Sequence, residues 1–288
     1  MSSTESTEGQ RGAGQEEKAQ EEIEQLSRSW DWHVRRKAAW GPDATAAVLE
    51  ALSRDASQWV REAVAGNDRT PPAALAWLAE DSSGYVRAAV ALNPRAAGEI
   101  LEMLAGDEMV DYDSTLQKNR YLVKEAVAKS QSISPSALTF LAKDSDEHVR
   151  AAAATNPLLS QESMARMVKD VFWQVRDNIA KNPSTPEDLL IYLSADRIMD
   201  VRATIASNPR TPAAALAALA KDKSWEVREA LAKNISLDGS ILEELAGHWS
   251  WVVRAAVAGN ANTPAGTLKR LAEDPDQSVQ KAARGRVR

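Results

Sequence analysis

The sequence of 288 residues contains no cysteine, and this absence removes several classes of function. Without thiols the chain forms no disulfides and offers no thiolate as a nucleophile or as a ligand of zinc or an iron–sulfur cluster. Histidine is scarce too, because His33, His148 and His248 are scattered without the spacing of metal ligands. Neither a glycine-rich phosphate loop nor a nucleophile elbow is present. The sequence therefore predicts no metal, no cofactor and no enzymatic activity.

Long hydrophobic runs are also missing. No apolar stretch approaches the roughly 20 residues that cross a membrane. The polar N-terminus has no secretory h-region, so we expect a cytoplasmic protein without membrane contact. Aromatic residues make up only 5% of the chain, strand-favouring runs are absent, and alanine is abundant. This composition favours helices that pack through small side chains over a β-rich core.

The net charge of −6 is concentrated near the N-terminus. Residues 1–28 hold seven acidic and three basic residues, which leaves the remainder close to neutral. Residues 1–14 are rich in Ser, Thr, Glu and Gly, a composition typical of disorder. We therefore expect an acidic, polar, disordered tail at 1–14.

The body of the sequence is a repeat. One valine anchors each copy, and successive anchors lie 26 residues apart except for one interval of 37. Such self-similarity is typical of solenoid architectures. The ten anchors are Val34, Val60, Val86, Val123, Val149, Val175, Val201, Val227, Val253 and Val279.

Each copy carries the signals of two short helices. Asp stands five residues before most anchors, as in Asp222, and suits a helix N-cap. The anchor and the residue four later form an apolar stripe. Asn follows seven residues after most anchors, as in Asn208, and tolerates the left-handed conformation that ends a helix. Thr-Pro pairs such as Thr211-Pro212 are typical of the N-cap and first residue of a second helix.

Neither helix of a copy can bury its apolar stripe alone, so neighbouring copies must stack. The sequence predicts an all-α solenoid of about ten two-helix repeats with a 26-residue period. We expect one solenoid over residues 15–288, a right-handed superhelix and no β-sheet. The long interval predicts an inserted loop at about 106–118.

The Asp-x4-Val-Arg signature, as in Asp81…Val86-Arg87 and Asp222…Val227-Arg228, is similar to HEAT repeats. The fuller unit V-R-x-x-V-A-x-N-P-x-T-P-x-x-x-L-x-x-L-A-x-D resembles the bacterial leucine-rich-repeat variant family over nearly all of residues 15–288. That resemblance implies an α-solenoid in which one helix of each pair can be a short 3₁₀ element. The founding type of the family is associated with an iron–sulfur cluster on an N-terminal Cys motif, which this chain lacks. The resemblance therefore implies no catalytic residues and no cofactor.

The arginine after each anchor forms a row with two interpretations. It could be a track for phosphates, or each guanidinium could bind an Asp of its own or the next repeat, as HEAT-like relatives imply. The second interpretation suits the bidentate geometry of Arg with carboxylate. We expect this structural ladder to include Asp81, Arg87, Asp144, Arg150, Asp170, Arg176, Asp196, Arg202, Asp222 and Arg228.

Two further rows are candidates for partner binding. Two and six residues after the anchor, alternate copies carry the pairs Glu125/Lys129, Asp177/Lys181 and Glu229/Lys233 in the favourable i,i+4 order. Trp32, Trp173, Trp225 and Trp251 share the slot two before the anchor, and Trp59 stands one before it. These tryptophans could be hot spots for a partner, or they could pack onto the next repeat.

The insertion begins Asp111-Tyr112-Asp113, which faintly resembles a calcium loop. However, Leu116 and Leu122 occupy the positions where such a loop needs Gly and Glu, so we expect no metal there.

These features favour a non-enzymatic scaffold that binds a protein or peptide on its curved surface. One alternative is a HEAT-like nucleic-acid-binding protein, but the paired charges do not provide the line of free cations that nucleic acid requires. A second alternative, an enzyme such as a lyase or DNA glycosylase of a HEAT-like family, needs an acid/base cluster that the sequence does not contain. The sequence does not indicate the oligomeric state.

Overall fold

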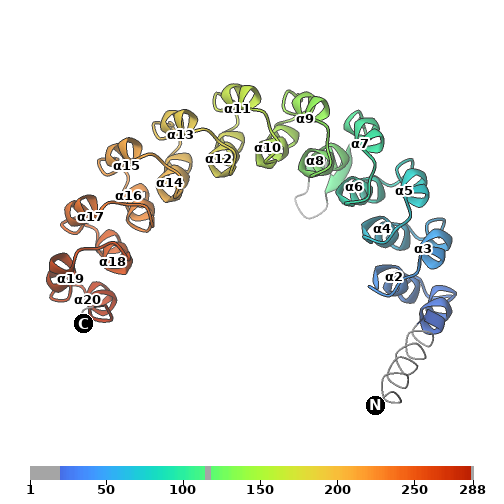
Figure 1. Cartoon of the computed structure of the whole chain (residues 1–288), viewed down its shortest axis with the longest axis horizontal. Coiled ribbons are helices and arrows are strands. Elements are labelled where there is room, and N and C mark those ends of the chain that lie inside the picture. The colour runs from blue at the N-terminus through green and yellow to red at the C-terminus, as the bar shows by residue number, and fades with distance from the viewer. Residues whose placement is uncertain (1–19, 114–117, 287–288) are drawn as a thin grey trace, which may run out of the picture. The chain divides into compact units, whose positions relative to one another are not determined.

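The computed structural model describes residues 20–113 and 118–286, and the expected tail at 1–14 lies outside them. The chain forms two compact units, Met1–Leu158 and Leu159–Arg288. Each unit is a row of stacked helix pairs (Figure 1). No helix within the described residues has the length and apolarity needed to cross a membrane.

The first unit starts with a helical segment at 20–27. Its further helices are α2 (Trp32–Trp40), α3 (Ala46–Leu52), α4 (Gln58–Gly66), α5 (Pro72–Leu78), α6 (Gly84–Leu92), α7 (Gly98–Ala105), α8 (Leu122–Lys129), α9 (Pro135–Leu141) and α10 (Glu147–Thr155). Two short strands, β1 (Asp111–Asp113) and β2 (Lys118–Arg120), lie between α7 and α8.

The second unit contains helices only among its described residues. They are α11 (Gln161–Met167), α12 (Trp173–Lys181), α13 (Glu187–Leu193), α14 (Met199–Ser207), α15 (Ala213–Leu219), α16 (Trp225–Ala232), α17 (Gly239–Leu245), α18 (Trp251–Gly259), α19 (Ala265–Leu271) and α20 (Gln277–Arg284). Both helices of each pair are α-helical, so the 3₁₀ element implied by the resemblance is not seen among the described helices.

Every anchor valine lies in an even-numbered helix, which confirms the two-helix repeat. Within each unit the row bends so that the even-numbered helices, here called the inner helices, lie on the inside of the bend (Figure 1). The odd-numbered outer helices lie on the outside. Successive inner helices pack directly on one another, as α2 does on α4 and α4 on α6. The inner helices therefore form the more continuous of the two surfaces.

The core lies between successive pairs. The anchors from Val60 to Val279 are almost completely buried, and so are outer-helix leucines such as Leu216 and Leu219. The alanine five residues after the anchor, such as Ala65 or Ala206, has no exposed surface. Small side chains at this position allow adjacent inner helices to approach closely.

The predicted helix caps are wrong in position. The N-cap of an inner helix stands three residues before the anchor, as Ser224 does in α16. The Asp five residues before the anchor instead accepts a bond from the backbone N–H two residues on, as Asp222 does from Ser224. Similarly, Pro212 rather than Thr211 is the N-cap of α15. The buried Thr211 hydroxyl donates to the Ile205 carbonyl and ties the turn to α14.

The expected left-handed Asn is also absent from the helix ends. Asn93 and Asn208, for example, have extended backbone with φ of −71°. The Asn side chain instead joins repeats, because Asn93 Nδ2 donates to the carbonyls of Ala65 and Asn67 in the preceding repeat at 2.7 and 2.8 Å. Asn67, Asn156, Asn208, Asn234 and Asn260 bond in the same way to the preceding repeat. Asn thus satisfies carbonyls that a helix end leaves open.

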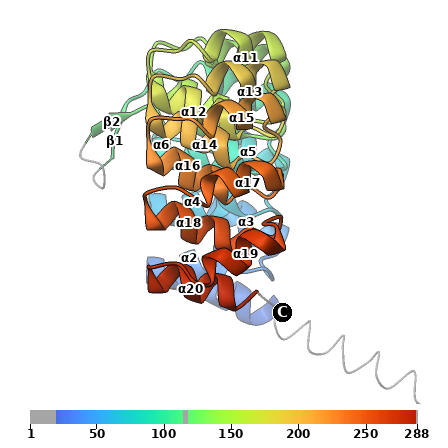
Figure 2. The same cartoon turned by 90° about the vertical axis from the view of Figure 1, so that its left-hand side faces the viewer.

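The expectation of no β-sheet is wrong at the insertion. Here β1 and β2 form an antiparallel hairpin that pairs Asp111 with Arg120 and Asp113 with Lys118. The hairpin projects beyond one edge of the helix row (Figure 2). The repeat register runs on through Asp107, so the extra residues lie between Asp107 and α8, in the region of the expected insertion at about 106–118. The carboxylate of Asp111 lies against Gly84, which leaves no room there for the tryptophan of other copies.

We expect Val201→Ala and Leu219→Ala each to lower the free energy of unfolding by about 2–4 kcal/mol, because both side chains are buried and leave a cavity. Ile235→Ala is the matched control, since Ile235 is 73% exposed in the same unit. Denaturant melts followed by circular dichroism measure the change. Equal melts for the core variants and the control would contradict the packing described here.

Candidate functional site

The arginine row lies at the edge where outer helices end and inner helices begin. A typical arginine of this row bonds the Asp of the next repeat and a backbone carbonyl of its own. Arg176 Nε and Nη2 donate to Asp196 at 2.6 and 2.9 Å, while Nη1 donates to the Asp170 carbonyl. Equivalent pairs are Arg35–Asp55, Arg61–Asp81, Arg87–Asp107, Arg202–Asp222 and Arg254–Asp274. Lys124 takes the place of arginine and pairs with Asp144 and Glu108.

These bonds also set the charge state of the ladder. Burial alone would raise the pKa of Asp196, but the bonds from Arg176 and from the Ile198 N–H outweigh it and lower that pKa. The pKa of Asp222 is lowered in the same way by Arg202 and Ser224. A carboxyl group with a lowered pKa stabilises the fold above its unfolded pKa, and this stabilisation is lost as the pH falls through the folded value. The ladder thus supports the fold at neutral pH.

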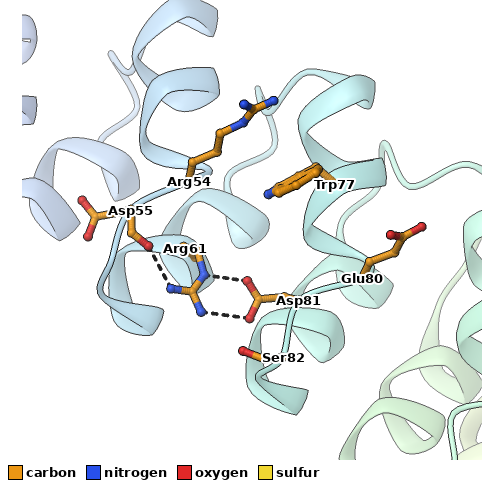
Figure 3. Close-up of a pocket in the computed structure, with 7 residues that line it drawn as sticks. All are labelled: Arg54, Asp55, Arg61, Trp77, Glu80, Asp81 and Ser82. Carbon is orange, nitrogen blue, oxygen red and sulfur yellow. Dashed lines mark hydrogen bonds and ion pairs between the residues drawn. The ribbon is translucent and has the colours of Figure 1, made fainter.

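A surface pocket lies directly over one step of the ladder (Figure 3). Arg61 forms its floor with both guanidinium edges committed to Asp81 and the Asp55 carbonyl. Arg54 crosses above, with its guanidinium carbon 4.9 Å from the centre of the Trp77 ring. A second pocket repeats this plan in the other unit, with Lys169 and Tyr192 in the places of Arg54 and Trp77. Because Arg61 and Arg176 are engaged, neither pocket offers a free ladder cation to a phosphate.

The remaining expected ladder members are Arg150, Asp170 and Arg228. Arg150 Nη1 donates to the carbonyls of Asp144 and Ser145. Asp170 accepts the Phe172 N–H, and its carbonyl accepts from Arg176. Arg228 Nε donates to the Asp222 carbonyl, and the next repeat carries His248 where the other steps have Asp.

His248 replaces part of what the ladder Asp does. Its Nδ1 accepts the Ser250 N–H at 3.0 Å, as Asp222 accepts the Ser224 N–H. It brings no negative charge to Arg228. Burial lowers the pKa of His248, and the neighbouring Arg228 cation lowers it further. Since the folded chain favours neutral imidazole, stability falls as the pH drops below the unfolded value of about 6.5.

We expect His248→Asp to raise the free energy of unfolding at pH 7 by about 1–2 kcal/mol, because it completes the ladder with Arg228. It should also remove the loss of stability between pH 6.5 and 5. Chemical denaturation at both pH values measures the effect.

His248→Asn is the matched control, because an amide can accept the Ser250 N–H but carries no charge. A gain for Asn as large as that for Asp would show that the turn, and not the ion pair, is responsible.

The lysines of the second candidate row lie on the inner helices. Lys181 binds Asp177 and Lys233 binds Glu229, each at 2.6 Å, with the lysine side chains 61% and 62% exposed. The expected Glu125–Lys129 pair is wrong, since Glu125 is buried and pairs with Arg120 of the hairpin. Asp177 is buried too and accepts a bond from Thr204 of the next repeat. The acids therefore lie deeper than an outward-facing row, because neighbouring inner helices cover them.

The candidate tryptophans divide into two groups. Trp32, Trp173 and Trp225 are half-buried, so packing accounts for part of their surface. Trp59 and Trp251 are exposed. Trp32 stacks on Trp59 of the next repeat with ring centroids 6.5 Å apart.

The structure extends the candidate residue Trp59 into a larger surface that the sequence reasoning missed. Trp40, Trp59, Tyr85 and Leu92 lie on α2, α4 and α6, at helix positions opposite the buried anchors, and all four are exposed. Small residues, Gly66, Ala88 and Ala89, lie between them. We call this set the inner aromatic patch. The sequence did contain a signal for this patch. Six residues after the anchor, where other copies carry polar or small residues, the first and third copies carry Trp40 and Leu92.

A second row of exposed apolar side chains lies on the outer helices of the same unit. It consists of Trp77, Met103 and Phe140. These helices splay apart in Figure 1, so the row is less continuous than the inner aromatic patch. Trp77 is further covered by Arg54.

Within the described residues, no group of three or more His, Asp or Glu is placed to hold a metal ion.

Comparisons with known proteins agree with the repeat architecture. Residues 86–109 and 251–276 match the family described as leucine rich repeat variant. A solved structure described as a leucine-rich repeat variant with a novel repetitive protein structural motif is 25% identical, with a TM-score of 0.59. The alignment covers 82% of this chain and 89% of that one. The predicted resemblance to this family is confirmed. No curated protein matches the sequence.

Other similar solved structures are more distant. A designed armadillo repeat protein in complex with the peptide (KR)4 is 15% identical, with a TM-score of 0.19 over 91% of this chain and 95% of that one. Importin beta is 12% identical, with a TM-score of 0.35 over 88% of this chain and 40% of that one. These scores are too low to inform the fold or the function of the present chain.

Proposed function

We propose, for a chain built from repeats of the leucine-rich-repeat variant type, a non-enzymatic scaffold that binds an extended peptide segment of a partner protein. The binding surface is the inner aromatic patch on α2, α4 and α6. Trp40, Trp59 and Leu92 expose 64%, 41% and 57% of their surface there. The exposure of four large apolar side chains on three neighbouring helices of a regular scaffold is the observation that carries this proposal.

The geometry of the inner helices supports a peptide as the ligand. Direct packing of α2 on α4 and α4 on α6 places equivalent side chains of successive repeats beside one another. An extended chain crossing these helices would meet a regular series of such positions. Large aromatic residues with small residues between them suit contact with the side chains of a peptide.

The ladder favours this proposal over nucleic-acid binding. Nucleic-acid affinity depends on cations that are free to contact phosphates. Arg61, Arg176 and Arg202 are instead held in bidentate pairs, and Lys181 and Lys233 are matched by acids. The inner aromatic patch departs from this self-neutralised pattern.

Selection of a random dodecapeptide library on the full chain tests the proposal. We expect selected peptides to bind the wild type and to lose at least about tenfold in affinity for the double variant Trp59→Ala, Tyr85→Ala, because aromatic anchors dominate such interfaces. Fluorescence polarisation with labelled peptides measures Kd.

Trp77→Ala is the matched control, because it removes an exposed tryptophan from the outer helices of the same unit. Peptides that bind the double variant as tightly as the wild type, or that lose affinity only for Trp77→Ala, would place binding elsewhere and overturn the proposal.

A further inference from the structure

One acidic side chain on the inner helices differs from its counterparts. Four copies carry an acid two residues after the anchor: Glu62, Glu125, Asp177 and Glu229. Arg120 binds Glu125, Lys181 binds Asp177 and Lys233 binds Glu229. Among the described residues, buried Oε2 of Glu62 has no hydrogen-bond partner. Three of these acids therefore have a bonded cation, whereas Glu62 has Arg36 near it but no ion pair with it among the described residues.

The sequence shows why Glu62 has no lysine on the next turn of its helix. Copies with Asp177 and Glu229 carry lysine four residues later, on the next turn of the same helix face. The copy with Glu62 has Gly66 at this position. The Trp40 indole lies over Gly66, where Cζ3 would be 3.2 Å from an added Cβ. The Trp40 ring thus occupies the place of the lysine.

The surroundings of Glu62 suit a cation supplied from outside. Trp59 lies three residues earlier on the same face of α4, and the Trp40 ring lies beside the position four residues later. Indole faces attract cations, most strongly where water is excluded. Arg36 of α2 influences Glu62 through space but makes no ion pair with it among the described residues. Burial raises the pKa of Glu62, as expected for a carboxyl group without a bonded cation.

We propose that Glu62, Trp59 and Trp40 form a pocket for the side chain of an arginine in the bound peptide, with the guanidinium on the Glu62 carboxylate and against the indoles. A guanidinium fits because its planar fork binds carboxylates and stacks on aromatic rings at the same time. This inference rests on the proposed function and specifies the ligand of the same surface.

The probe is the peptide Ac-GSLRLSG-NH2, compared with the same peptide containing citrulline, a neutral analogue of arginine. Two-dimensional NMR of the ¹⁵N-labelled full chain follows the indole N–H peaks, assigned by Trp→Phe variants. We expect the arginine peptide to shift the peaks of Trp59 and Trp40 and to bind at least about tenfold more tightly than the citrulline peptide. Equal affinity for the two peptides would overturn the inference.

Two variants test the role of Glu62 independently. Glu62→Gln keeps the shape and removes the charge, so it should abolish the preference for arginine. Gly66→Lys introduces the lysine that the Asp177 and Glu229 copies carry at this position, so it should also abolish the preference for arginine. Retention of the arginine preference in either variant would overturn the inference.

Thermal melting separates loss of binding from loss of fold. Glu62→Gln should melt at or above the wild-type temperature, because it removes a buried charge without a partner. Library peptides that require Trp59 and Tyr85 but ignore Glu62→Gln would leave the peptide scaffold standing and reject the arginine pocket. Peptides that ignore Trp59 and Tyr85 would reject the scaffold itself.

Discussion

The bidentate bond between an arginine and the Asp of the next repeat is the interaction on which the arrangement depends. It joins Arg61 to Asp81 and Arg202 to Asp222, and each guanidinium also holds a carbonyl of its own turn. The Asn side chains make a second connection at the other end of the inner helices. With both ends tied, the buried valines and alanines keep one register from repeat to repeat within each unit.

The charges of the ladder pair with one another. The positions available for a specific function are therefore those where the sequence of the repeat changes. At Gly66 a lysine is missing and Trp40 fills its place, four residues after Glu62. At His248 a carboxylate is missing and the ladder loses one ion pair. At Gly84 a tryptophan is missing because the hairpin carboxylate of Asp111 occupies its space. Each departure changes one local interaction while the neighbouring repeats preserve the backbone, which allows such a scaffold to acquire a specific surface.

Local sequence signals indicated the helices well and their ends less well. Asp222 and Thr211 have the residue types of N-caps, yet they bond the adjacent turn and the preceding helix instead. Asn208 has the residue type of a left-handed helix end, yet its side chain reaches the preceding repeat. In each case a partner about 20 to 28 residues away or a neighbouring turn competes with the local cap. The conformational propensities of the residues within one copy give no information about that partner.

The constant interval between valines was enough to determine the two-helix repeat, the buried stripe and the need for stacking, because these follow from helical periodicity and from the burial of apolar surface. Only the tertiary structure decided which groups meet between copies. It paired arginine with the following Asp, folded the insertion into a hairpin that supplies Arg120 to Glu125, and placed Trp40 against Gly66. Those outcomes depend on distances between helices that lie more than 20 residues apart in sequence or on the fold of an insertion, and neither is encoded in the repeat period.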